Sequence, residues 1–118
     1  MSNNRLQRVA ASLFFLAILA TGEAAAQIKM LGFDDNSCQA WVRSKEEPER
    51  RREYVSWARG FLSGHNYANQ KQAVSEVSRG TVEQYIERFC RDKPKADFTE
   101  AAYRMSDDYS GRSTPISR

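Results

Sequence analysis

Histidine and cysteine are scarce in this sequence. Its 118 residues include one histidine, His65, and two cysteines, Cys38 and Cys90. A structural zinc site takes four cysteine or histidine ligands at close spacing, and these three residues are too few and too scattered to form one. We therefore expect neither a metal ion nor another cofactor.

Catalytic motifs are also missing. The sequence contains no glycine-rich phosphate loop, no His-Glu zinc helix and no nucleophile elbow. Ser63 and His65 are the one serine–histidine pair at short spacing, but residues two apart on a helix do not face each other. We interpret His65 as a structural histidine, with pH sensing as the second interpretation and a catalytic base as the third. We expect a protein that is not an enzyme.

The N-terminus carries the one strongly apolar run. Arg5 and Arg8 precede the apolar residues 9–21, and the small residues 24–26 follow. This order is typical of a signal peptide cleaved after Ala26, which predicts export to the periplasm. The alternative is an uncleaved anchor, but the run is shorter than the roughly 20 residues that cross a bilayer. No second apolar run follows, so we expect no stable membrane insertion.

Charge of one sign is not in large excess. The sequence has 18 basic and 15 acidic residues, a net charge of +3. Loss of residues 1–26 removes two arginines and one glutamate, which leaves +2. A mixed surface of this kind does not favour nucleic acid. We expect a protein partner or unfolded protein clients instead.

The two cysteines both follow the signal peptide. In an oxidising compartment such a pair most simply forms one disulfide, Cys38–Cys90. The closed loop spans about half of the exported chain, and the loop-entropy estimate of its stabilisation is on the order of 4 kcal/mol. Each cysteine shares a helical face with apolar residues, Cys38 with Trp41 and Val42, so we expect a buried bridge.

Apolar residues recur at helical spacing in several segments, which predicts an all-α fold. Ser37 is a good N-cap for a helix over residues 38–45. Pro48 suits the first turn of a long second helix that frays over 66–69. Thr81 and Gln84 form a capping-box pattern for a third helix. A fourth helix over 98–105 completes a small orthogonal bundle of three to four helices closed by one disulfide.

The remaining segments set the domain boundaries. We expect a leader over 27–36, one helical domain over 37–105 and a disordered tail over 106–118. The polar stretch 70–80 is expected to hold a short helical turn around residues 73–77. Gly80 is expected to mark a break before the third helix.

The disulfide predicts how these helices pack. Bridged cysteines have Cα atoms about 5 to 6 Å apart, so the first helix must dock on the third, and the second packs across both. Gly60 and Gly64 each cost about 1 kcal/mol in a helix interior, which predicts close approach of a neighbouring element. The expected centre of the core is Trp41, Tyr54, Phe61, Ile86 and Phe89.

Three consecutive arginines, Arg50, Arg51 and Arg52, form the one basic run. Consecutive helical residues fan over nearly a full turn, so we interpret the run mainly as a solvated helix paired with neighbouring glutamates. The alternative is a docking patch for an acidic partner. The candidate partner surface consists of Trp57, Phe61, Leu62, Arg50, Arg51 and Arg52.

Three segments together resemble a known family. They are SCQAWV at 37–42, WARGFL at 57–62, and the series Thr81, Val82, Ile86, Cys90, Asp92, Lys93 and Phe98. In order and spacing around the cysteines they are similar to the HdeA/HdeB-type periplasmic proteins. That resemblance implies an all-helical acid-stress chaperone, a homodimer that loosens at low pH and holds unfolded clients on exposed apolar surface. The helix around 57–62 would supply that surface, and the disulfide would keep the loosened chain compact.

A second resemblance is weaker. The helix with Gly60 and Gly64, followed by a helix that starts with Thr81 and Val82, looks like the Tai-type immunity proteins. That resemblance implies the alternative function, an immunity-type inhibitor that binds a secreted effector enzyme.

Overall fold

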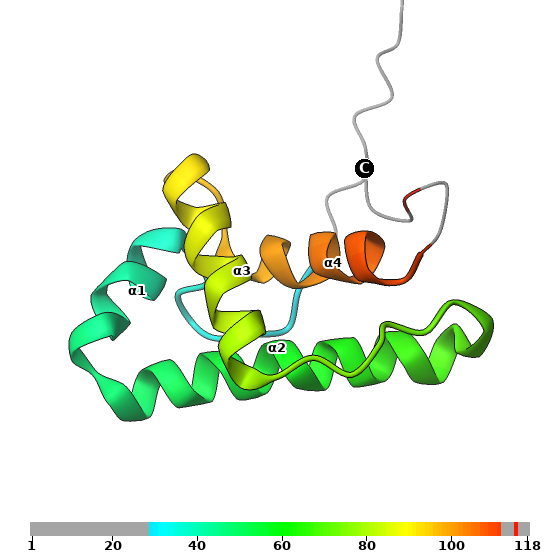
Figure 1. Ribbon diagram of the computed structural model, residues 1–118. Helices are drawn as coiled ribbons and strands as arrows, with labels where there is room; N and C mark the ends of the chain where they lie inside the picture. The colour runs from blue at the N-terminus through cyan, green and yellow to red at the C-terminus, as the bar shows by residue number, and fades with distance from the viewer. Residues whose placement is uncertain (1–28, 112–114, 116–118) are drawn as a thin grey trace, which may run out of the picture.

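The computed structural model describes residues 29–111 and residue 115. The expected signal peptide, residues 1–26, lies outside them. The described residues are all-α (Figure 1), with α1 (Cys38–Arg43), α2 (Pro48–Ala68), α3 (Arg79–Asp92) and α4 (Phe98–Tyr109), and single-turn 3-10 helices η1 (Ser44–Glu46) and η2 (Gln70–Gln72). The predicted fold class is confirmed.

The first two helices begin where their local sequence predicts. The Ser37 hydroxyl accepts a hydrogen bond from the Ala40 backbone N–H at 3.0 Å, which makes Ser37 the N-cap of α1. Pro48 occupies the first turn of α2, where its missing N–H costs nothing. α2 ends at Ala68, inside the range 66–69 where fraying was expected, but residues 66–68 are regular helix.

The predicted start of α3 is wrong by three residues. The helix begins at Arg79, and the Ser78 hydroxyl accepts from the Thr81 backbone N–H at 3.1 Å. Ser78 is therefore the N-cap, and Thr81 lies inside the first turn. Gly80 lies in that turn too, instead of marking a break. An earlier serine with extended backbone satisfies the free N–H groups before the capping box can.

The helical turn expected around residues 73–77 is also wrong. The only helical turn of this stretch is η2, and residues 73–78 run extended. The Asn66 side chain explains why: its carbonyl accepts from the Val74 N–H at 2.7 Å and its amide donates to the Val74 C=O at 3.0 Å. A side-chain amide thus takes both backbone groups that a helix would use.

The last helix runs beyond the expected limit of the domain. α4 continues to Tyr109, and Ser106 and Asp107 are buried, although a disordered tail was expected from residue 106. The Ser106 hydroxyl donates to the Tyr103 carbonyl at 2.6 Å. The polar character of residues 106–109 led to the expectation of a disordered tail. Hydrogen bonds inside the helix let such residues form its last turns instead.

The helices form a small bundle around α2. Figure 1 shows α2 as the base, with α4 above it and α3 crossing steeply. The disulfide docks α1 on α3, as predicted, with Cα atoms 5.2 Å apart and both cysteines buried. α2 packs against η1, α3 and α4. Val42 lines the same hollow as the two bridged cysteines, as its shared face with Cys38 predicts, but it is 57% exposed.

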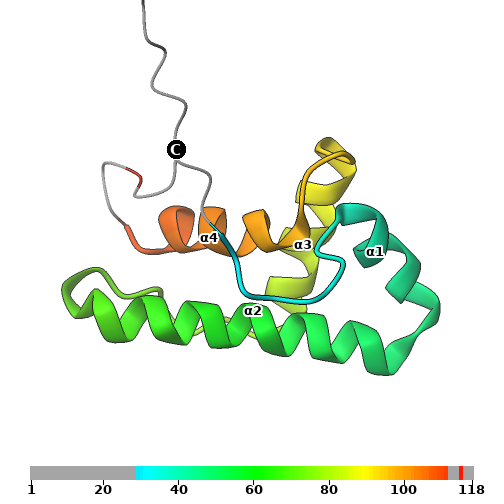
Figure 2. The same cartoon turned by 180° about the vertical axis from the view of Figure 1, so that it is seen from behind.

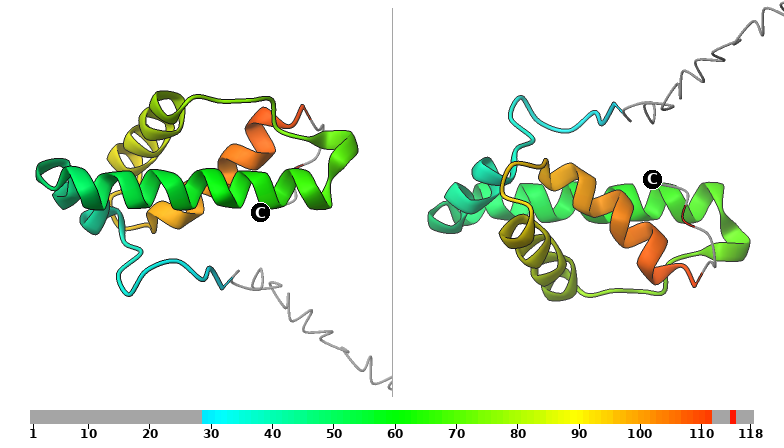
Figure 3. Two further views of the ribbon diagram at one scale, coloured as in Figure 1. Left: turned by 90° about the horizontal axis from the view of Figure 1, so that it is seen from below. Right: turned by 90° about the horizontal axis from the view of Figure 1, so that it is seen from above.

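The segment before α1 is part of the fold. Figures 2 and 3 show residues 29–36 on one side of α2, with α3 on the other side. Phe33 packs on the rings of Tyr54 and Phe98, at centroid distances of 4.6 and 6.0 Å. Gly32 is required there, because an added Cβ would lie 2.6 Å from the Asn36 side-chain oxygen. The expected leader therefore ends in core residues.

Phe98 occupies the centre of the core. It is fully buried, and its ring lies 4.6 Å from Tyr54 and 5.9 Å from Trp41. Of the expected centre, Trp41, Tyr54 and Ile86 are buried, whereas Phe61 and Phe89 are only partly buried.

The explanation expected for the α2 glycines is wrong. Gly60 and Gly64 are exposed, and no other atom lies within 4 Å of an added Cβ at either position. Residues 74–77 line a hollow that Gly60 also lines, but none of their atoms lies within 4 Å of the added Cβ.

Candidate functional site

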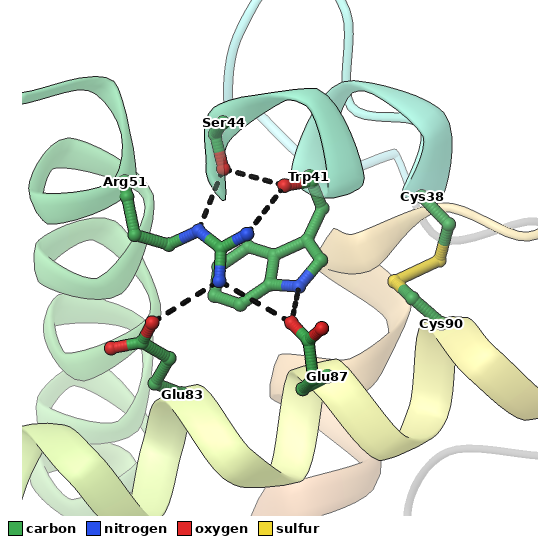
Figure 4. Close-up of polar contacts among 7 residues, drawn as sticks. All are labelled: Cys38, Trp41, Ser44, Arg51, Glu83, Glu87 and Cys90. Atoms are coloured by element: carbon green, nitrogen blue, oxygen red, sulfur yellow. Dashed lines mark hydrogen bonds and ion pairs between the residues drawn. A yellow bond between two sulfur atoms is a disulfide. The ribbon is translucent and has the colours of Figure 1, made fainter. Parts of the chain in front are cut away.

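A buried arginine joins three elements at one end of the bundle (Figure 4). Arg51, in the first turns of α2, is 9% exposed. Its guanidinium lies over the fully buried Trp41 ring, 3.8 Å from the centroid. This stacking is favourable because the cation faces the negative face of the indole. The sequence analysis placed Arg51 on a solvated helix, and the structure corrects that.

Every nitrogen of the Arg51 guanidinium has a partner. Nε donates to Ser44 Oγ at 2.7 Å, and Nη2 donates to the Trp41 carbonyl at 2.7 Å. Nη1 donates to Glu83 Oε1 at 3.1 Å and to Glu87 Oε2 at 3.3 Å. These bonds join α2 to α1, η1 and α3. We call Trp41, Ser44, Arg51, Glu83 and Glu87 the arginine cluster.

The indole closes the arginine cluster. Trp41 Nε1 donates to Glu87 Oε2 at 2.8 Å, so one carboxylate oxygen receives both the indole and the guanidinium (Figure 4). The Ser44 hydroxyl in turn donates to the Trp41 carbonyl at 2.6 Å. A buried cation with a partner at every nitrogen is strongly favoured over the same cation with one partner removed. The Glu83 and Glu87 side chains are 46% and 40% exposed, and solvent weakens their share.

The other two arginines of the run remain in solvent. Arg50 pairs with Glu53 at 3.5 Å, and Arg52 pairs with Glu49 at 4.0 Å. The interpretation as exposed helix pairing is confirmed for these two. The run is therefore not one patch, because its middle member points inward.

The aromatic part of the candidate partner surface is also divided. Trp57 and Phe61 are partly buried and stacked, with centroids 6.0 Å apart. Trp57 Nε1 donates to the Leu31 carbonyl at 3.0 Å. Leu62 is only 4% exposed and belongs to the core. The six expected residues do not share one exposed surface.

The serine–histidine pair has separate surroundings. Ser63 Oγ donates to the Arg59 carbonyl at 3.0 Å, back along its own helix. Nδ1 of His65 lies 3.2 Å from the Asn66 side-chain oxygen, the same oxygen that holds Val74. This arrangement agrees with the structural interpretation of His65.

Residues 29–111 and 115 contain neither a cluster suited to a metal ion nor a helix suited to a membrane. Within them no three or more His, Cys, Asp or Glu side chains gather to hold a metal ion. None of the helices in that range has the length and apolar character needed to cross a membrane.

No protein-family model, no curated protein and no solved structure matches the chain. The side chains of this chain, and how they are arranged, are therefore the only basis for proposing a function.

Two sets of hydrogen bonds outside the arginine cluster also change the pKa of a side chain, Tyr85 in one case and Asp35 in the other. The Tyr85 hydroxyl of α3 donates to the Asp108 carboxylate of α4, and burial together with that bond raises the pKa of Tyr85. At the other end of the bundle, the Ser37 hydroxyl and backbone N–H beside Asp35 lower the pKa of that exposed carboxyl, with a smaller contribution from Arg43.

The sequence analysis missed Ser44, Glu83 and Glu87. One signal was present: Glu83 and Glu87 are four apart and flank the apolar positions of α3, so they project together from the edge of its buried face. The partner across the bundle could not be identified, because any of the three consecutive arginines could have faced them.

Proposed function

We propose that this chain is an exported, non-enzymatic protein that holds unfolded clients during acid stress, as an HdeA-like chaperone does. The observation that carries the proposal is the arginine cluster, a buried cation whose charge is balanced by carboxylates alone. The resemblance to HdeA/HdeB-type proteins agrees with it.

Acid acts on the two sides of the cluster differently. Carboxyl groups in general take up protons at about pH 2 to 3, and the counter-charge of Arg51 comes from the carboxylates of Glu83 and Glu87. Arg51 keeps its charge, because a guanidinium stays protonated throughout this range. A buried cation without its counter-charge costs several kcal/mol. The stability that the ion pairs of Arg51 give to the folded state is thus present at neutral pH and lost as the pH falls.

The groups that face Arg51 come from every element packed against it. They are the carboxylates of α3, the Ser44 hydroxyl of η1 and the Trp41 ring and carbonyl of α1. Among them only the two glutamates carry a carboxyl group. Three further cations, Lys45, Arg88 and Arg91, line the adjacent groove. Their repulsion of Arg51 grows once the carboxylates are neutral, which also favours separation of α2.

Separation of α2 from η1 and α3 supplies the client-binding surface. The faces released would carry Tyr54 and Leu62 of α2 and Phe98 of α4, which are now buried. The Cys38–Cys90 bridge does not titrate in acid and keeps α1 attached to α3. The loosened state would expose apolar surface without becoming a fully extended chain.

A client-protection assay tests the proposal. Light scattering of a denaturing client protein at pH 2 to 3 should fall when the intact disulfide-bonded protein is added, and should not change at pH 7. No suppression at any pH, with the helical fold retained, would remove the proposal.

A charge-matched pair of variants ties the activity to the cluster. The double variant E83Q/E87Q mimics the protonated carboxyls, so client holding should begin at a higher pH than in the parent. The control E49Q/E53Q removes two exposed glutamates with the same change of charge and should leave the onset unchanged. Equal onset in both variants would contradict a role for the arginine cluster.

A further inference from the structure

An open groove of about 450 Å³ lies between η1 and α3, beside the arginine cluster. Lys45 reaches it from η1, and Arg88 and Arg91 reach it from α3. All three side chains are exposed. Arg51, Glu83 and Glu87 also line the groove.

The three exposed cations have no acidic partner within the described chain. The ion pairs there use Arg43, Arg50, Arg51, Arg52 and Arg104. Lys45, Arg88 and Arg91 belong to none of them and make no side-chain hydrogen bond. The groove has four cationic residues against two glutamates, an excess of two positive charges. Both glutamates are already bonded to Arg51, so the excess lies with the exposed cations.

An apolar hollow of about 330 Å³ lies along the same α1–α3 junction. It is lined by Val42, Pro94 and the two bridged cysteines, among others. Val42 is 57% exposed and precedes Lys45 by three residues, so the two side chains leave the same side of the helical segment. Basic and apolar surfaces therefore adjoin at this junction.

We propose that the groove between η1 and α3 binds an acidic segment of a partner protein at neutral pH. Carboxylates of the segment would contact Lys45, Arg88 and Arg91, and a neighbouring apolar side chain would cover Val42 and Pro94. The proposal is independent of acid-induced client binding, because it concerns the folded state and a specific charge pattern.

The chemistry of the groove favours a protein over a membrane or a nucleic acid. A flat anionic bilayer cannot follow a concave groove, and Glu83 and Glu87 in its wall oppose a continuous phosphate backbone. Spaced carboxylates with an apolar neighbour match the alternation of cations and Val42. Complementary charge of this kind sets specificity and association rate in protein interfaces.

Fluorescence anisotropy with a labelled hexaglutamate peptide tests the site at pH 7 and low salt. The double variant R88Q/R91Q should weaken binding by about tenfold or more. The control K29Q/K71Q removes two exposed lysines that lie outside the groove and should weaken binding by less than about twofold. Equal weakening in both variants would mean that the peptide responds to net charge alone, and would overturn the proposal.

Location and occupant are checked in the same samples. Addition of the peptide should shift backbone amide NMR signals of residues 44–46 and 84–91, whereas shifts confined to other segments would contradict the site. Vesicles containing anionic phosphatidylglycerol and a single-stranded oligothymidine are the competing probes. Tighter binding of either one, with the same dependence on Arg88 and Arg91, would reject a protein partner. Circular dichroism of each variant should match the parent, since all four replaced side chains are exposed.

Discussion

The two ends of the bundle are held by different forces. At the disulfide end, which comprises α1, η1, the first turns of α2 and the α3 residues Glu83, Glu87 and Cys90, a covalent bridge and the arginine cluster add to apolar packing. At the far end, residues 69–78 are held against α2 mainly by the Asn66 contacts with Val74, and α3 meets α4 through Tyr85 and Asp108. The comparison teaches that reduction and loss of the Arg51 counter-charge act on the disulfide end, whereas the far end depends on the Asn66 hydrogen bonds, the Tyr85–Asp108 bond and packing.

Loss of the disulfide should have the largest effect. The variant C38S removes on the order of 4 kcal/mol of loop-entropy stabilisation and leaves a hydroxyl and a free thiol in the core. We expect it to be unfolded or molten at 37 °C, measured by thermal melting with near-ultraviolet circular dichroism. Replacement of the neighbouring exposed Gln39 by serine is the control and should melt like the parent. A sharp transition of C38S near that of the parent would show that the bridge is not needed at this end.

Removal of the buried arginine should have the second largest effect. The variant R51A loses the stacking on Trp41 and leaves the Glu83 and Glu87 carboxylates without their cation, a loss of about 2 kcal/mol after allowance for their exposure. Its neighbour provides the control, because R52A loses only an exposed pair with Glu49 and should cost less than about 0.5 kcal/mol. Urea unfolding at pH 7 measures both variants. Equal losses of unfolding free energy in the two variants would mean that a buried arginine stabilises this fold no more than an exposed one.

Replacement of the two α2 glycines, Gly60 and Gly64, tests stability away from the disulfide end. G60A and G64A should each stabilise the fold by about 0.5 to 1 kcal/mol, because alanine is the better helix former and both positions face open space. The increase should appear in the midpoint of urea unfolding. A decrease would indicate that another molecule or a second copy covers this face of α2 in solution.

The smallest expected effect is a change of stability at alkaline pH that depends on Tyr85. The raised pKa of Tyr85 means that the folded state favours the protonated phenol. Its contribution is therefore fully present below the ordinary tyrosine pKa of about 10 and is lost as the pH rises through the folded value. The variant Y85F should lose less stability than the parent between pH 9 and 11, followed by urea unfolding at each pH. Y67F, at an exposed tyrosine, is the control and should follow the parent.

Local patterns predicted most of the helices but not their exact ends. Ser37, Pro48 and the apolar spacing of α3 and α4 act within one turn of the chain, and these predictions are confirmed. The start of α3 required a choice between two capping residues, Ser78 and Thr81, which local sequence alone did not settle. The extended course at Val74 depends on Asn66, eight residues away, and no periodicity reveals such a contact.

The site was harder to predict than the fold. The disulfide followed from the presence of only two cysteines. The arginine cluster depends on separations of seven to 46 residues, from Ser44–Arg51 to Trp41–Glu87, and on which member of the basic run points inward. That choice depends on how α2 packs against η1 and α3. Tertiary packing, not helix propensity, therefore decides which arginine is buried.

The aromatic core also has a consequence for folding during synthesis, when the chain emerges from its N-terminus. Phe33 and Trp41 lie at the start of the described chain, whereas Phe98, the ring that fills the space between them and Tyr54, comes 57 residues after Trp41. A chain delivered from its N-terminus must present the first two rings before their shared partner arrives. The core can close only when α4 has emerged, so folding should be a late, all-or-none event and not a stepwise accretion of helices.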